Sequence, residues 1–209
     1  MAGGIKQADL FAQEPTLPQA RDPSVQGRAL PEGFVYQPGL LTPAEEAALL
    51  GIIRALPLEE ATYKEYTAKR RTVSYGGKYD YDRNVLNAAA PIPESLFPLR
   101  GKVASWVGIP AEQFVHGLVT EYRPGTPLGW HRDVPDFEAI VGVSLGGTAR
   151  MKLRPYKPGE RNLVKDVIAL DLEPRSAYSI RGTARRGWQH SIAATKELRY
   201  SITFRTARK

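Results

Sequence analysis

The sequence predicts a mainly β protein of the α+β class, with a short N-terminal α/β region before an all-β core. Two stretches before residue 108 have helical spacing of apolar residues, and short alternating runs separated by Gly and Pro follow residue 112. Such runs are typical of an antiparallel sandwich, a jelly roll or a barrel. The length of 209 residues suits a single domain.

The N-terminal region begins with residues 1–30, which are rich in Gln, Pro, Gly and Ala and predict a flexible arm before one domain at 31–209. A short strand is expected at 33–36. Thr42, Pro43 and Glu45 then have the spacing of a helix start with a capping box. This helix should end before Pro57, and a second helix is expected over 93–107.

A basic, tyrosine-rich segment covers residues 63–83, with a Gly76-Gly77 turn between two extended pieces. Its cationic side chains can contact phosphates and its tyrosine rings can stack on bases. The alternative is a hairpin that packs its tyrosines on the core. The candidate substrate-binding residues here are Arg70, Arg71, Tyr75, Tyr79 and Tyr81.

The core should contain eight strands. We expect them at about 114–122, 128–132, 139–145, 149–154, 166–172, 176–181, 188–193 and 197–206. The last strand alternates strictly, so its apolar and polar side chains should face opposite ways. The apolar set is Leu198, Tyr200, Ile202 and Phe204, and the polar set is Arg199, Ser201, Thr203 and Arg205.

Composition excludes several classes of protein. The absence of cysteine excludes disulfides, thiolate metal sites and cysteine nucleophiles. No apolar run reaches the roughly 18 residues of a membrane span, and the N-terminus has no secretory pattern. A cytoplasmic monomer without membrane contact is the default expectation. The 29 basic and 22 acidic side chains, a net charge of +7, favour a polyanionic partner.

A metal site is predicted from the histidines. His131 and Asp133 are two residues apart on an extended segment, so their side chains point to the same side. His190, on a distant strand, could complete a set of two histidines and one carboxylate, which leaves open positions on Fe(II). A surface His–Asp pair without metal is the alternative. His116 lacks a partner at ligand spacing and is expected to be structural.

The polar face of the last strand offers two guanidinium groups. Arg199 and Arg205 lie roughly 20 Å apart along an extended strand and could approach a short dicarboxylate from opposite ends. An edge strand that turns this face to solvent is the alternative.

Taken together, the segments HRD at 131–133, WQHSI at 188–192 and RYSITFR at 199–205 resemble the AlkB family of Fe(II)/2-oxoglutarate-dependent dioxygenases. The resemblance extends from ADLFAQEP near the start, through the tyrosine-rich segment and residues 119–125, almost to the last residue. It implies a double-stranded β-helix, or jelly roll, with an N-terminal helical and hairpin extension over the substrate. It also implies that 63–83 is a nucleotide-recognition lid.

The resemblance also implies roles for individual residues. His131, Asp133 and His190 would bind Fe(II). Arg199 would pair with the distal carboxylate of 2-oxoglutarate, and Arg205 would lie near its other end. The remaining expected contacts to this cosubstrate are Tyr122, Thr120 and Ser201, the last two standing where asparagines are common in the family. O2 and 2-oxoglutarate would be consumed, giving succinate, CO2 and an aldehyde, which is formaldehyde when the alkyl group is methyl.

The implied substrate is an N-alkylated base in DNA or RNA, as in DNA repair or RNA demethylation, taken from a single strand or out of the stack. Val134-Pro135-Asp136 departs from the acidic residues that often follow the iron motif, and Asp136 is the candidate replacement. Two alternatives stay open. One is a 2-oxoglutarate oxygenase acting on a protein side chain or small molecule, and the other is a noncatalytic, basic nucleic-acid-binding jelly roll.

Overall fold

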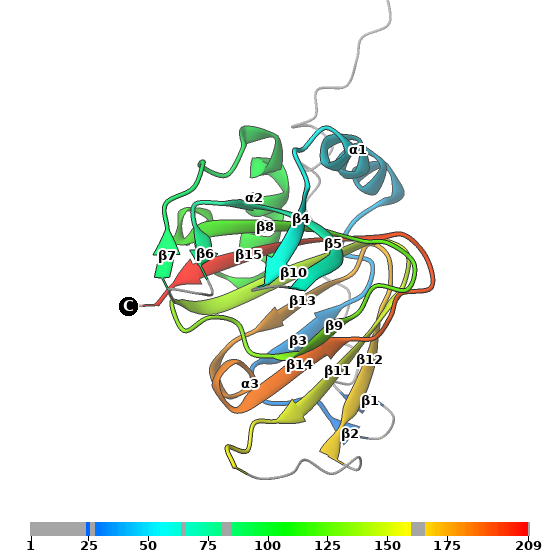
Figure 1. The fold of residues 1–209 in the computed structure, drawn as a ribbon, viewed down its shortest axis with the longest axis vertical. Helices are drawn as coiled ribbons and strands as arrows, with labels where there is room; N and C mark the ends of the chain where they lie inside the picture. The colour runs from blue at the N-terminus through cyan, green and yellow to red at the C-terminus, as the bar shows by residue number, and fades with distance from the viewer. Residues whose placement is uncertain (1–23, 26–27, 64–65, 81–84, 160–165, 209) are drawn as a thin grey trace, which may run out of the picture.

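The computed structural model describes residues 24–25, 28–63, 66–80, 85–159 and 166–208, and it forms a two-sheet β sandwich (Figure 1). The larger sheet has the strand order β3-β13-β10-β15-β8-β5-β4. The bounds in that order are Phe34–Gln37, Ala177–Ile180, Phe137–Gly146, Arg199–Ala207, Phe114–Tyr122, Tyr66–Tyr75 and Glu59–Tyr63. All its neighbouring strands are antiparallel.

The smaller sheet has the order β12-β11-β14-β9, also antiparallel throughout. Its strands are Ile168–Leu172, Ala149–Pro155, Trp188–Ile192 and Leu128–His131. Two small hairpins pair β1 (Ser24–Val25) with β2 (Arg28–Ala29) and β6 (Lys78–Asp80) with β7 (Val85–Asn87). A one-and-a-half-turn helix, α3 (Gly182–Gly187), leads into β14.

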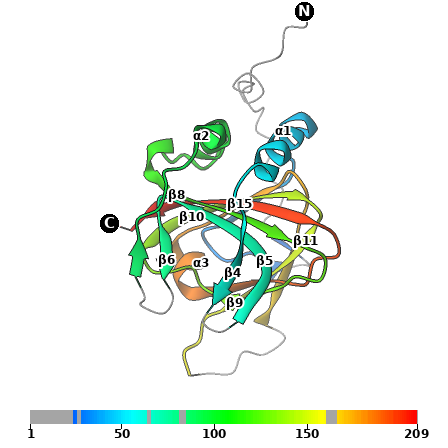
Figure 2. The same cartoon turned by 45° about the horizontal axis from the view of Figure 1, so that its top comes forward.

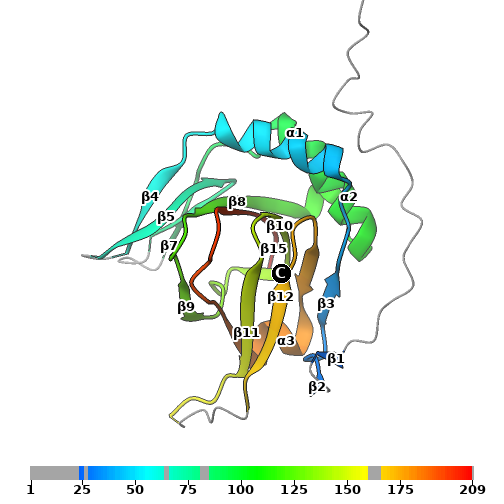
Figure 3. The same cartoon turned by 90° about the vertical axis from the view of Figure 1, so that its right-hand side faces the viewer.

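Two helices, α1 (Pro43–Arg54) and α2 (Phe97–Val107), cover the face of the larger sheet that points away from the smaller one (Figures 2 and 3). Helix α1 starts as predicted, because Thr42 accepts a hydrogen bond from the Glu45 amide and the Glu45 carboxylate accepts one from the Thr42 amide. Short 3₁₀ turns precede α2 and β8, at η2 (Glu94–Leu96) and η3 (Ala111–Gln113).

Alternation along the strands separates an apolar outer layer from a more polar interior. On β15, Tyr200, Ile202 and Phe204 are buried in the core beneath the helices. Arg199 and Arg205 consequently point the other way, into the space between the two sheets. A second apolar cluster fills the rest of that space, so the polar interior is confined to one region of it. This arrangement brings side chains from β8, β9, β13, β14 and β15 together.

The mainly β, jelly-roll architecture is confirmed, and all eight core strands occur within two residues of their expected bounds. Leu198 differs from its expectation: it lies before β15 and is 45% exposed. The expected turn at Gly76-Gly77 between two extended pieces is formed, between β5 and β6, and β5 is a long strand of the larger sheet. Most of the expected arm at 1–30 lies outside the described residues. None of the helices that the structure describes is long and apolar enough to span a membrane.

Candidate iron and 2-oxoglutarate centre

Three side chains with metal-binding atoms meet at one end of the interior. The ligand atoms of His131, Asp133 and His190 all lie within 4.8 Å of one another. The two imidazole centroids are 4.2 Å apart, and His190 Nε2 is 3.6 Å from Asp133 Oδ2. This is the two-histidine, one-carboxylate set that suits Fe(II) in oxygenases. The grouping expected from the sequence is therefore formed.

Strand pairing explains why these residues meet. β9 ends at His131, which lies directly opposite His190 on β14. Asp133 comes two residues after the end of β9, so its carboxylate returns to the same side of the chain. The Nδ1 atom of His131 is 2.8 Å from the Gly129 carbonyl oxygen, which orients the ring through the nitrogen on the far side from Nε2.

The carboxylate of Asp133 is held by Arg205. Nε and Nη2 of Arg205 donate to the same oxygen, Oδ1, at 2.9 and 2.7 Å. Burial raises the pKa of Asp133, but the charge of Arg205 and the neighbouring His190 and His131 outweigh it and hold the pKa well below its usual range. Asp133 is therefore ionised, and its second oxygen faces His190.

His190 is 9% exposed, and burial followed by the effect of His131 lowers its pKa to about 3. The ring is therefore neutral at physiological pH, which is the form that binds a metal ion. An ionised carboxylate and a neutral imidazole together fit a divalent cation, and these residues can hold one without first losing a proton.

The other end of the interior fits an organic carboxylate. Arg199 is 1% exposed; its Nε donates to Ser144 Oγ at 3.0 Å, and its guanidinium lies over the Tyr122 ring with 4.8 Å between Cζ and the ring centroid. Its Nη1 atom is buried without a hydrogen-bond partner among the described residues. A buried cationic donor without a partner is costly, and a carboxylate would satisfy it.

Side chains between Arg199 and the three ligands complete the interior. Thr120 and Ser201 lie opposite each other on β8 and β15 and are both buried. Tyr178 was not foreseen from the sequence, because its position depends on Gly142 of the neighbouring strand. A methyl group on Gly142 would lie only 2.3 Å from Tyr178 Cζ, so the ring lies flat against the glycine. Burial raises the pKa of Tyr178 to about 12; Tyr122 and Asp133 act in the same direction, and the charges of Arg199 and Arg205 oppose it.

Comparisons with known proteins decide the family. Residues 33–205 match the 2OG-Fe(II) oxygenase superfamily, which is most of the chain. The chain belongs to this superfamily. Its members use Fe(II), 2-oxoglutarate and O2, and the protein is thus an Fe(II)/2-oxoglutarate-dependent dioxygenase.

Within the superfamily this oxygenase is AlkB-like. It is 29% identical over 182 residues to "Alkylated DNA repair protein ALKBH8 homolog" of Arabidopsis thaliana, covering 77% of this chain and 50% of that protein. It is 28% identical over 200 residues to "Uncharacterized protein L905" of Acanthamoeba polyphaga mimivirus, covering 85% and 86% of the two chains. The structure of OsALKBH1 shares the fold, with a TM-score of 0.67 at 16% identity over 86% of this chain and 99% of that one.

The expected substrate residues of the oxygenase are not brought to one place. Tyr75 is 7% exposed and packs in the core beneath the helices, so neither face of its ring is free to stack. Arg71 points to the same outer face, where it bonds Glu121 and the Leu58 carbonyl. Arg70 lies opposite Tyr122 at the far end of β5 from Gly76, on the side of the sheet that Tyr122 and Arg199 face, and it stays a candidate for contact with a substrate. Packing accounts for Tyr75 and Arg71 without a substrate.

Three further expected residues lie elsewhere. Tyr79 is part of β6 and is half-buried. Tyr81 lies outside the described residues. Asp136 is exposed, and its carbonyl accepts a hydrogen bond from the Arg208 amide. Tyr79 and Asp136 are the two side chains of this group that stay candidates for contact with a substrate.

A basic and aromatic surface that sequence reasoning did not single out lies on the outer face of the smaller sheet, whose strands β9 and β14 carry His131 and His190. Its members are the outward-facing Trp130, Arg132, Lys152, Arg154 and Tyr156, here named the basic rim. Arg154 Cζ lies 4.2 Å from the Trp130 ring centroid, and Arg132 Cζ lies 3.7 Å from that of Tyr156. Trp130 and Arg132 flank His131 in the chain, so strand alternation places them on the opposite side of β9 from the ligands.

A buried arginine organises the chain after the iron ligands. Arg185 of α3 donates from Nη2 to the carbonyls of Val134 and Phe137, at 2.6 and 2.9 Å. It is 7% exposed, so these bonds fix residues 134–137 rather than offer a charge to solvent.

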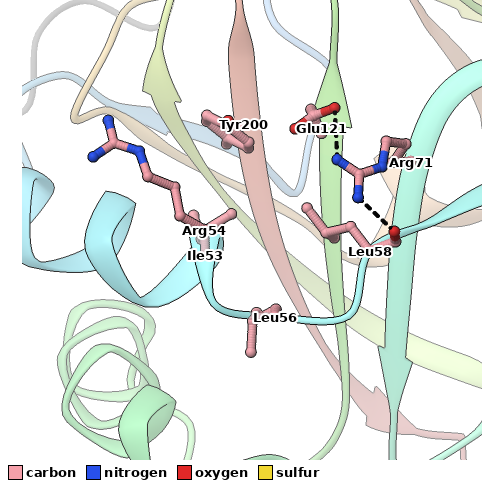
Figure 4. Close-up of a pocket in the computed structure, with 7 residues that line it drawn as sticks. All are labelled: Ile53, Arg54, Leu56, Leu58, Arg71, Glu121 and Tyr200. Atoms are coloured by element: carbon pink, nitrogen blue, oxygen red, sulfur yellow. Dashed lines mark hydrogen bonds and ion pairs between the residues drawn. The ribbon is translucent and has the colours of Figure 1, made fainter.

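A small pocket of about 140 Å³ lies on the opposite face of the larger sheet (Figure 4). Ile53, Leu56, Leu58, Arg54, Arg71, Glu121 and Tyr200 line it. Tyr200 and Glu121 are the chain neighbours of Arg199 and Tyr122 and point away from them. The sheet therefore separates this pocket from the iron centre.

Proposed function

We propose that this AlkB-like oxygenase oxidatively removes alkyl groups from N-alkylated bases of DNA or RNA. The observation that supports this substrate class best is the basic rim on the outer face of the smaller sheet, whose strands β9 and β14 carry His131 and His190. An oxygenase of small uncharged molecules has no need of a cationic and aromatic surface there, whereas phosphates and bases are bound by these side-chain types.

Among the described residues, the two arginines of the rim donate to neutral partners. Arg132 donates to the carbonyl of Arg186 at 3.2 Å, and Arg154 donates to the amide oxygen of Gln189 at 2.8 Å. Both partners are neutral, so the two guanidinium groups keep their full charge. The chain as a whole has a net charge of +7, which also favours a polyanion.

The Arabidopsis relative, named as an alkylated DNA repair protein, is a second support. The present chain spans half the length of that protein, so the likeness concerns the oxygenase region. A target base would have to leave the stack or come from a single strand to reach a buried centre.

In this proposal the side chains of the interior bind and orient the reactants. His131, Asp133 and His190 would hold Fe(II), and the guanidinium of Arg199 would bind the distal carboxylate of 2-oxoglutarate beside Ser144 and Tyr122. Iron with 2-oxoglutarate and O2 supplies the oxidation of the alkyl C–H bond. Arg70, Tyr79 and Asp136 are the candidates for contact with the nucleic acid.

The test measures formaldehyde released from single-stranded oligonucleotides that contain 1-methyladenine or 3-methylcytosine, with Fe(II), 2-oxoglutarate and ascorbate. We expect release that requires 2-oxoglutarate and is lost in His131→Ala. Arg154→Gln should raise the KM for the oligonucleotide and leave the KM for 2-oxoglutarate unchanged. The slope of log KM for the oligonucleotide against log salt concentration should fall by about one. Arg54→Gln, on the far face of the larger sheet, is the matched control.

A second candidate keeps the cofactors and replaces the substrate by a protein side chain or a small molecule. It is favoured by Pro135, which stands where an acidic residue would contact the base. Absence of formaldehyde from every methylated strand, with normal 2-oxoglutarate binding, would reject the nucleic-acid proposal in favour of this candidate.

A further inference from the structure

His116, expected to be structural, lies on the interior face of β8 close to the iron ligands. It is 6% exposed, and its ring packs against Phe137 with 4.6 Å between centroids. It is not among the three grouped ligands. Its two ring nitrogens nevertheless both have partners.

The first partner is Arg205. Nδ1 of His116 is 3.3 Å from Nη1 of Arg205, while Nε and Nη2 of the same guanidinium hold Asp133. All three guanidinium nitrogens are thus engaged, with the imidazole on one side and the carboxylate on the other. Since Arg205 can only donate, Nδ1 must accept, and the proton of the neutral imidazole is then on Nε2.

Neutrality of the ring is consistent with its surroundings. Burial lowers the pKa of His116 to about 3, and the charge of Arg205 contributes in the same direction. In a protonated ring Nδ1–H would face the Nη1–H of Arg205, donor against donor, so the observed contact requires the neutral form.

The second partner is the turn between β5 and β6. His116 forms a hydrogen bond with the Gly77 backbone. The turn itself lies tightly on β8: Gly76 has φ +75°, and a Cβ there would be 1.9 Å from the Val115 carbonyl oxygen. The Gly76 amide also donates to the Ala90 carbonyl at 2.7 Å, so both ends of the β6–β7 hairpin converge beside His116.

We propose that His116 is a positioning residue that ties the Gly76-Gly77 turn to Arg205 and so fixes the orientation of the Asp133 carboxylate. One neutral ring links the base of the β6–β7 hairpin to an iron ligand through two hydrogen bonds. A displacement of the hairpin base is thereby transmitted to the metal-binding oxygen. The inference rests on the iron centre and not on the identity of the substrate.

The first test is Mn(II) binding to the metal-free protein by isothermal titration calorimetry. His116→Phe keeps a ring against Phe137 but removes both hydrogen bonds, and we expect about tenfold weaker binding, in the range found when partners of metal ligands are removed. His116→Asn keeps an acceptor at the position of Nδ1 and should recover most of the affinity. Tyr200→Phe, which loses a buried hydroxyl on the opposite face of β15, should bind as the wild type does.

The second test is deuterium uptake of the peptide containing residues 76–80. Uptake should be faster in both His116→Phe and His116→Asn, because both lose the bond to Gly77, and unchanged in Tyr200→Phe.

Wild-type Mn(II) affinity in His116→Phe would overturn the link to Asp133, and unchanged uptake would overturn the link to the turn. If His116→Phe does not fold, His116→Gln replaces it, with weaker Mn(II) binding than His116→Asn expected. Neither measurement uses a nucleic acid, so failure of the proposed substrate would not affect them.

Discussion

Arg205 donates two hydrogen bonds to a single oxygen of Asp133, at 2.9 and 2.7 Å, and leaves the other oxygen facing His190 at 3.6 Å. The sequence led us to expect Arg205 at one end of 2-oxoglutarate. In the structure its guanidinium holds Asp133, and the expected contact with 2-oxoglutarate stays a prediction; on β15, among the described residues, Arg199 keeps a buried donor, Nη1, without a partner. The two arginines of β15 therefore differ in their contacts.

Replacing Arg205 with methionine should weaken metal binding. The side chain keeps most of its length, but Asp133 loses two charge-assisted hydrogen bonds, and its pKa should rise because the largest of the effects that oppose burial is removed. We expect Mn(II) affinity to fall by roughly 10–100-fold at neutral pH, with a steeper loss on acidification. Calorimetric titration at two pH values measures this, and equal affinities would disprove the role of Arg205.

Replacing Arg199 with methionine should act on the cosubstrate instead. Loss of a charge-assisted pair of about 1.5–3 kcal/mol predicts a KM for 2-oxoglutarate that is roughly 10–100-fold higher, with Mn(II) affinity little changed. Steady-state succinate formation measures the KM for 2-oxoglutarate, and calorimetry measures the Mn(II) affinity. The matched control is Arg181→Met, an exposed arginine that contacts the Val107 carbonyl.

Replacing Gly142 with alanine should displace Tyr178. The new methyl would lie 2.3 Å from Tyr178 Cζ, so the ring must move, at a cost of about 1–3 kcal/mol of unfolding free energy. Denaturant unfolding should show this loss, and the double variant Gly142→Ala/Tyr178→Leu should recover part of it. A stability of Gly142→Ala equal to that of the wild type would contradict the close packing described here.

Stability of the metal-free protein should decrease as the pH falls below about 6.5. The pKa values of His116 and His190 are lowered to about 3 in the folded state, by burial first and then by Arg205 or His131 respectively. Between about pH 6.5 and 3 the unfolded chain therefore binds protons that the folded chain does not, and the free energy of unfolding falls by up to ~1.4 kcal/mol per pH unit for each histidine.

The pH dependence can be assigned by mutation. Unfolding measured between pH 6.5 and 4.5 should have a shallower slope in His116→Phe, whereas Tyr200→Phe should keep the wild-type slope. An identical slope in His116→Phe would mean that this ring is not buried in its neutral form.

Local patterns predicted much of the fold because they act over short distances. The capping box of Thr42 and Glu45 and the alternation of Tyr200, Ile202 and Phe204 need only neighbouring residues to be recognised. Tyr75 shows the limit of this reasoning. Its sequence context suggested a base-stacking ring, but strand pairing with β8 turns it to the face that the helices cover.

Contacts between distant strands were beyond local reasoning. Tyr178 lies against Gly142 and His116 against Arg205, and neither pair follows from spacing along the chain. The triad was accessible because His131 and Asp133 are two residues apart and few other histidines could complete it. The basic rim could not be predicted in this way, since Trp130 contacts Arg154 only after β9, β14 and β11 have paired in the smaller sheet.

The central claim is that His131, Asp133, His190 and Arg199 form one iron and 2-oxoglutarate centre. The most direct measurement is succinate formation from 2-oxoglutarate by purified protein, with and without Fe(II), in wild type, His131→Ala and Arg199→Ala. We predict turnover that requires Fe(II), is abolished in His131→Ala, and is lost in Arg199→Ala while Mn(II) binding persists. Wild-type turnover by either variant would contradict the assignment of the centre.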